Sequence, residues 1–292
     1  INIYLNFSYK KSAFIGHAFM FMPSMMIWTT DTRKESMIFF SSILIWYLTL
    51  KLLKEREWSK RKRILYISAI CLLLWVSTLL RIHMLFTLGG GLLVCLFFSY
   101  LKTRRRSTLA FGIAVFAACL IITFSTVFVN MRDYHAIPMD TSQMGDKNID
   151  NEVKSIFQII IEKDIPESIN GFLTEPHLEA VANITDIAGY YSLVTIVRIE
   201  MVLWYLCMVV AVFGFLDAII KWDPYLLGLI AYIGSYILIN ALMSENIADT
   251  YYRYRAAIVA PVLLFADYRP FADHLKALFM EGFKKRDPLD FR

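Results

Sequence analysis

Long runs of apolar residues constrain this chain more than any other feature of its sequence. Several of them approach the roughly 20 residues that an α-helix needs to cross the hydrocarbon core of a bilayer. Hydrophobic residues make up 58% of the chain and charged residues 19%, whereas a soluble domain has about 45–50% and 25%. The runs also lack the short alternation of membrane β-strands. The sequence therefore predicts an all-α fold, a polytopic transmembrane helical bundle.

The predicted bundle has about eight apolar segments, of which the first and the last are short. Their ranges are 12–28, 36–53, 64–80, 82–101, 108–130, 194–220, 225–243 and 256–266. The last segment is either a half-helix or a span that continues as far as Phe271. We expect four parts in all: a first transmembrane block at 1–130, an extracytoplasmic region at 131–193, a second transmembrane block at 194–271 and a cytoplasmic tail at 272–292.

The region 131–193 is the one sizeable part of the chain that is predicted to lie outside the membrane. Apolar residues recur there at helical spacing, namely Val153, Ile156, Phe157, Ile160 and Ile161. This spacing predicts a short amphipathic helix that lies on the membrane or caps the spans.

Two basic clusters orient the predicted spans. The loop after the second span carries seven Lys and Arg residues between Lys51 and Arg63, and the loop after the fourth carries four more at 102–106. Loops rich in basic residues face the cytoplasm. Both loops do so only if the third and fourth spans form a hairpin with its tip, residues 81–83, outside. We therefore predict both termini in the cytoplasm. Because the chain begins at Ile1 and not at Met, we expect it to be part of a longer protein.

Charged residues gather at the predicted outer edge of the bundle. A charge at membrane depth needs a partner, a water-filled cavity or an anionic ligand. Guanidinium groups bind phosphate bidentately, and a polyprenyl-linked sugar donor presents a diphosphate at the membrane surface. The candidate substrate-binding residues are Arg33, Lys34, Arg81, Arg253 and Arg255. The candidate catalytic residues, as general bases for an acceptor hydroxyl, are Glu35, His83 and Asp249.

Each of these residues also has a structural interpretation. The first outer turn suits solvated charges, and Arg81 suits the cap of a tight hairpin. Residues 251–255 read YYRYR, which fits arginines that snorkel to the interface within an aromatic belt. Arg198 and Glu200 fit a pair on one helix face with a structural partner.

The sequence indicates neither a metal site nor a nucleic-acid interface. The four cysteines, Cys71, Cys95, Cys119 and Cys207, all lie in apolar spans and fit small buried hydrophobes. No CxxC or Cys/His spacing typical of a metal site occurs. We expect no metal and no cofactor. We also expect no nucleic-acid partner, because no basic stripe with interleaved aromatic residues lies outside the spans.

Three short motifs carry a resemblance to a known family. Residues 22–28 hold a Pro-Ser turn and a Trp, and residues 33–36 read RKES. Residues 79–83, LLRIH, resemble an Arg-Pro-His hairpin tip in which Ile82 replaces the proline. Residues 252–255, YRYR, with Pro261 after them, resemble an Arg-Tyr-Arg…Pro helix start. Together they resemble bacterial polysaccharide-assembly membrane proteins of the O-antigen polymerase-like kind.

The resemblance implies a specific function and location. It implies polymerisation or transfer of a polyprenyl-diphosphate-linked glycan at the outer face of a bacterial inner membrane, among membrane lipids. The alternative is a non-enzymatic membrane subunit that scaffolds other membrane subunits, or a transporter. A spatial test separates these functions, because the first requires Arg33, Arg81, Arg253 and Arg255 to surround one lipid-accessible cavity.

Overall fold

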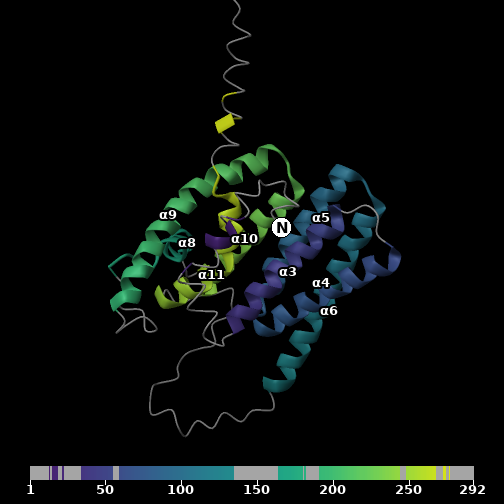
Figure 1. The fold of residues 1–292 in the computed structure, drawn as a ribbon. Helices are drawn as coiled ribbons and strands as arrows, with labels where there is room; N and C mark the ends of the chain where they lie inside the picture. Colours follow the sequence, from purple (N-terminus) through teal and green to yellow (C-terminus); the bar gives the residue numbers. More distant parts are fainter. Residues whose placement is uncertain are drawn as a thin grey trace, which may run out of the picture.

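The fold is a bundle of α-helices (Figure 1). This computed structural model describes residues 13, 15–18, 22, 34–54, 59–134, 164–179, 181, 191–243, 248–267, 272–273 and 276. Its helices are α3 Lys34–Lys54, α4 Lys60–Leu80, α5 His83–Thr103, α6 Arg106–Tyr134, α8 Ile165–Thr174, α9 Tyr191–Ile220, α10 Pro224–Met243 and α11 Ala248–Phe265. Over the described residues there is no β-strand. The predicted all-α class is confirmed.

Six helices of the described chain are long and apolar enough to cross a membrane. Their apolar stretches are Ser36–Lys54, Arg61–Leu80, His83–Thr103, Arg106–Thr123, Val194–Ile220 and Pro224–Leu242. The chain is therefore a multi-pass integral membrane protein. These stretches correspond to six of the predicted spans. The predicted segment 256–266 falls in α11, whose apolar part, Tyr254–Phe265, is shorter. Most of the predicted segment 12–28 lies outside the described residues.

The predicted hairpin is present between α4 and α5. Arg81 leaves the helical conformation, with φ −152° and ψ 115°, and its backbone N–H still donates to the Ser77 carbonyl. Ile82 follows, and α5 begins at His83. The chain thus reverses within two residues, and both flanking helices keep the length of a membrane span.

Small residues let α5 and α10 pack at backbone distance. A Cβ added at Gly228 of α10 would lie 2.5 Å from the Cβ of Cys95 and 2.9 Å from the Gly91 carbonyl oxygen, both of α5. A second close approach joins α9 to α11, because a Cβ at Gly214 would overlap the Phe265 carbonyl. Close contact at small residues is a usual means of helix association in membranes, where lipid and side chains are equally apolar.

The helices share two ends. At the end that we call the Lys54 end, α3, α5 and α9 terminate, and the Lys54 ammonium lies 5.5 Å from the centre of the Tyr225 ring at the start of α10. At the opposite end, which we call the Arg81 end, the Arg81 guanidinium lies 3.9 Å from the centre of the Tyr254 ring of α11. Both predicted basic loops flank the Lys54 end. Which end faces the cytoplasm stays a prediction.

Short α8 lies in the region that is predicted to be extracytoplasmic. Asp164 caps its first turn by accepting from the Glu167 N–H at 3.2 Å, and Pro166 suits the first turn of a helix. Phe172 is fully buried, so α8 packs onto the bundle beside α10 and α11 (Figure 1). The amphipathic helix predicted around Ile156 lies outside the described residues.

Candidate functional site

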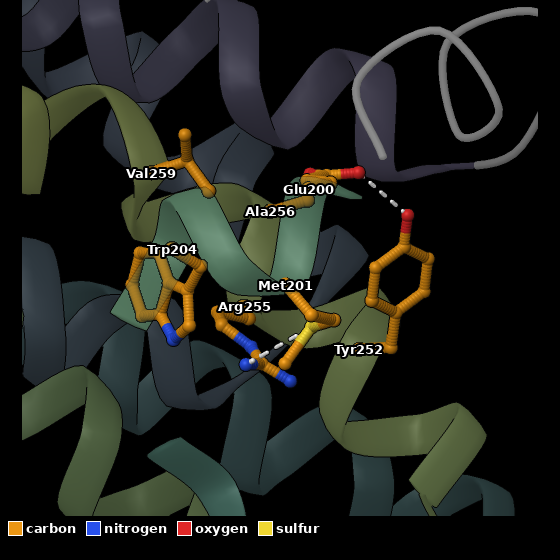
Figure 2. A pocket seen from close by; sticks show the side chains of 7 residues that line it. All are labelled: Glu200, Met201, Trp204, Tyr252, Arg255, Ala256 and Val259. Atoms are coloured by element: carbon orange, nitrogen blue, oxygen red, sulfur yellow. Dashed lines mark hydrogen bonds between the residues drawn. The ribbon is translucent and has the colours of Figure 1, made fainter. Parts of the chain in front are cut away.

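The first turns of α11 lie between two groups of polar side chains. On one side of α11 stands the α4–α5 hairpin, and on the other stand α8 and α9. The helix has 3.6 residues per turn, so Tyr252 and Arg255 share one face, while Tyr254 is turned toward the hairpin. Figure 2 shows the side that faces α9.

Arg255 is a buried cation, only 3% exposed. Its Nη1 donates to the Leu173 carbonyl at 3.1 Å and lies 3.7 Å from the Met201 sulfur. The guanidinium carbon lies 5.3 Å from the centre of the Trp204 ring, within the range of a cation–π interaction. Its Nε and Nη2 have no hydrogen-bond partner in the part of the chain that the structure describes. Two donor nitrogens of Arg255 are therefore available to a ligand.

The same cluster holds the C-terminal end of α8. The Trp204 indole N–H donates to the Leu173 carbonyl at 2.9 Å, and the Tyr205 hydroxyl donates to the Thr174 carbonyl at 2.6 Å. The last carbonyls of a helix lack partners within the helix, and its C-terminal end carries a partial negative charge. Arg255, Trp204 and Tyr205 satisfy both requirements. A structural role for Arg255 is thus visible beside any binding role.

Glu200 supplies a buried carboxylate to the site. It lies on α9, is 5% exposed, and accepts a hydrogen bond of 2.8 Å from the Tyr252 hydroxyl (Figure 2). The negative charge of Glu200 acts on Arg255. Burial of an ionised group is costly without partners, and the Tyr252 hydroxyl supplies one to Glu200 across the boundary between α9 and α11.

A small hollow opens between these side chains. It is lined by Glu200, Met201, Trp204, Tyr252, Arg255, Ala256 and Val259 (Figure 2). Its volume is about 10 Å³, roughly the space that the centre of one water molecule needs. In this conformation the hollow accepts a water molecule and no larger ligand.

The hairpin contributes a second buried cation at the same end. Arg81 is 9% exposed, and its guanidinium lies against the Tyr254 ring. His83 meets the Tyr236 ring edge-on at 5.9 Å between ring centres, and the Tyr236 hydroxyl donates to the Tyr254 carbonyl at 3.1 Å. Arg81, His83 and the start of α11 therefore form one connected polar cluster.

The remaining sequence-predicted site residues are placed by their backbone or not at all. Lys34 and Glu35 begin α3, which contacts α11, and Asp249 and Arg253 lie in the first turns of α11. Arg33 lies outside the described residues. The structure thus brings Arg81, His83 and Arg255 to one end of the bundle, and the roles predicted for all of these residues stay predictions.

Glu200, Trp204 and Tyr252 join the site without having been predicted as site residues. Glu200 could have been found from the sequence, because a carboxylate inside an apolar span usually has a functional role. The predicted pair of Arg198 and Glu200 has another form in the structure. Arg198 is exposed and its Nε donates to the Leu178 carbonyl at 2.7 Å, whereas Glu200 is buried against Tyr252. Residues two apart in a helix do not share a face.

No grouping of three or more His, Cys, Asp and Glu side chains suited to a metal ion occurs among the described residues. Comparison of the chain with protein-family models, with curated proteins and with solved structures gives no match. The candidate function therefore rests on the residues of the site and on the sequence motifs.

Tyr205→Phe is expected to loosen α8 without unfolding the bundle. The change removes the hydroxyl that donates to the Thr174 carbonyl, a hydrogen bond that contributes about 0.5–1.5 kcal/mol. Amide hydrogen exchange should then quicken by about 2- to 10-fold in α8. Amides of α10 around Tyr232 serve as the internal control and should exchange as before. Equal rates in α8 would contradict the prediction.

Proposed function

We propose that this membrane protein binds a polyprenyl-diphosphate-linked glycan at its Arg81 end and polymerises or transfers it there. The observation that carries the proposal is the burial of two guanidinium groups, one from the α4–α5 hairpin and one from α11, at the same end of the bundle. Arg81 lies against Tyr254, and Arg255 follows Tyr254 in the chain. Two buried cations on the two sides of one helix end in a membrane protein favour an anionic ligand at that end.

The hydrogen bonding of Arg255 supports this proposal. Its Nη1 donates to a neutral carbonyl, and its Nε and Nη2 have no partner in the described part of the chain. A guanidinium prefers two parallel bonds to phosphate or carboxylate oxygens. A diphosphate oxygen pair would therefore satisfy donors that the described protein groups leave unused.

Binding of a diphosphate to Arg255 requires the C-terminal end of α8 to move away. The hollow of about 10 Å³ is too small for the ligand, and the C-terminal end of α8 occupies one donor of Arg255. We call the form with α8 on Arg255 closed and the form with α8 displaced open. A ligand that binds the open form more tightly than the closed form increases the population of the open form. In the proposal, the diphosphate replaces the Leu173 carbonyl on Arg255 and displaces α8.

The proposed chemistry is a glycosyl transfer at the outer face of a bacterial inner membrane, with both termini in the cytoplasm. An acceptor hydroxyl attacks the anomeric carbon, the bond from that carbon to the diphosphate oxygen breaks, and the polyprenyl diphosphate leaves with the bonding electrons. Arg81 and Arg255 stabilise the charge on the leaving group. His83, Glu35 and Asp249 stay the candidates for the base that takes the hydroxyl proton.

Arg81→Gln and Arg255→Gln are each expected to weaken binding of polyprenyl diphosphate by about 10-fold or more, because a charge-assisted hydrogen bond contributes about 1.5–3 kcal/mol. Native mass spectrometry of the full chain in detergent measures the affinity. Polyprenol, which lacks the diphosphate, should bind equally to all forms. Arg198→Gln, an exposed arginine of α9, is the matched control.

The same variants should lose glycan assembly in cells when activity is normalised to the amount of folded protein in the membrane, with Arg198→Gln as the reference. If folded Arg81→Gln and Arg255→Gln proteins both bind polyprenyl diphosphate as tightly as the unsubstituted chain, the proposed function is wrong.

A scaffold is the second candidate, and one observation favours it. Arg255, Trp204 and Tyr205 all hydrogen-bond the end of α8, so the cluster fixes the region outside the spans onto the bundle. A scaffold needs such a fixed surface for partner subunits. It predicts that Arg255→Gln loosens α8, as read by hydrogen exchange, and leaves polyprenyl diphosphate binding absent in every form.

A further inference from the structure

The Lys54 end brings cations from separate helices around one tyrosine. Lys54, the last residue of α3, lies 5.5 Å from the centre of the Tyr225 ring. Arg105, between α5 and α6, acts electrostatically on the hydroxyl of the same tyrosine. Tyr225 is the second residue of α10. Lys54 and Tyr225, which are far apart in sequence, therefore lie side by side, and Arg105 is near enough for its charge to act on the same hydroxyl.

The local backbone explains why the arginines face outward. Arg104 adopts the left-handed conformation, with φ 51°, and its N–H donates to the Tyr100 carbonyl at 2.7 Å, which ends α5. The Arg105 carbonyl accepts from the Thr108 N–H at 3.0 Å, which starts α6. This tight turn exposes three successive arginines, 104–106. Like charges at such spacing repel each other unless an anion lies between them.

The described carboxylates at this end are already engaged. Asp223 accepts from the backbone N–H groups of Tyr225 and Leu226 at 2.9 and 3.3 Å and so caps α10. Asp217 is paired with the Lys221 ammonium at 2.8 Å. Among the described residues neither carboxylate forms an ion pair with Lys54 or Arg105, and the Arg105 side chain is exposed.

An exposed tryptophan marks the depth of this site in the bilayer. Trp222 is 63% exposed in the turn between α9 and α10, and its ring meets Phe98 of α5 edge-on at 5.5 Å. Tryptophan is enriched at the level of the lipid headgroups. Phe97 and Leu101 are exposed on the adjoining surface of α5. Cations thus stand at headgroup depth, with apolar surface beside them for acyl chains.

We propose that Lys54, Arg105 and Tyr225 form a binding site for the headgroup of an anionic phospholipid. Basic pockets between transmembrane helices bind such headgroups. The Arg105 guanidinium and the Lys54 ammonium bind the phosphodiester oxygens, and the Tyr225 hydroxyl donates a further hydrogen bond. The site lies at the end of the bundle opposite Arg81 and is independent of the proposed function.

The test compares two lipids on the purified full chain. Native mass spectrometry in detergent measures binding of phosphatidylglycerol and of phosphatidylcholine. The unsubstituted protein should prefer phosphatidylglycerol, and the double variant Lys54→Gln with Arg105→Gln should lose about 10-fold or more of that preference, because each basic group contributes about 1 kcal/mol. Tyr225→Phe should lose about 2- to 5-fold, the effect of one hydrogen bond.

The matched control removes the same charge elsewhere at the same end. Arg61 and Lys62 are exposed residues at the start of α4, and Arg61→Gln with Lys62→Gln should keep the lipid preference. If this control loses as much preference as the Lys54 and Arg105 variant, or if that variant keeps its preference, the site is refuted. Binding of inorganic phosphate as tight as that of phosphatidylglycerol would also refute a lipid site. Equal thermal midpoints establish that both variants are folded.

Discussion

Gly228→Ala should cost this protein most of its folded state. The added Cβ would lie 2.5 Å from the Cβ of Cys95 and 2.9 Å from the Gly91 carbonyl oxygen. Both atoms belong to or adjoin the backbone of α5, so no flexible side chain can move aside. Overpacking costs about 1–3 kcal/mol and occasionally more. Here α5 and α10 must separate along their length, and we expect a loss at the upper end of that range or above it.

Gly234→Ala provides a matched control within the same helix. Apart from the adjacent residues and the nearby backbone of α10, no atom in the described part of the chain lies within 4 Å of a Cβ added at Gly234. Alanine is favoured over glycine in a helix by about 0.5–1 kcal/mol, so this variant should be as stable as the original chain or slightly more so. Thermal unfolding in detergent, followed by the monodisperse fraction in size-exclusion chromatography, compares the two. Equal midpoints for Gly228→Ala and Gly234→Ala would mean that the two helices do not touch as described.

Arg255→Met is expected to have the second large effect on stability. Methionine keeps much of the volume but removes the donor to Leu173 and the positive charge that lies against the Trp204 ring. Loss of a buried hydrogen bond from a charged donor destabilises by about 1.5–3 kcal/mol. Denaturation of the purified chain in mixed micelles measures the change. Arg198→Met removes an exposed arginine and should cost about 1 kcal/mol or less.

A double-mutant cycle separates the charge pair from the loss of packing. Glu200→Gln removes the negative charge but keeps an oxygen for the Tyr252 hydroxyl. If the two charges compensate each other, the double variant should be more stable than the sum of the single changes predicts, by about 1 kcal/mol or more. Strict additivity would show that Arg255 acts through α8 and Trp204 alone.

The spans were predictable because their signal is local. A run such as 82–101 states its own length and apolar character, and the bilayer thickness then determines that it forms a crossing helix. The hairpin followed from a second local signal, the basic clusters on either side of the pair 64–80 and 82–101. Neither inference required knowledge of which helices touch.

The site was only partly predictable because its contacts are not local. Arg81 and residues 252–255 were predicted at one edge of the membrane, and the structure places the Arg81 guanidinium on the Tyr254 ring. The hydrogen bond from Tyr252 to Glu200 joins residues 52 positions apart, and the sequence holds no pattern that pairs them. The docking of α8 on Trp204 and Arg255 depends likewise on tertiary packing.

The close contact at Gly214 divides α9 into two parts of unequal length. The helix contacts the Phe265 carbonyl at this glycine. The longer part, N-terminal to Gly214, carries Glu200, Trp204 and Tyr205, and their hydrogen bonds hold it in place. Fourteen residues at 1.5 Å each separate Glu200 from Gly214, an arm of about 21 Å. If α9 tilted by about 10° about Gly214, Glu200 would therefore move by about 4 Å. A displacement of that size would break the hydrogen bond from Tyr252 to Glu200, so the short bonds of this cluster hold α9 in its orientation.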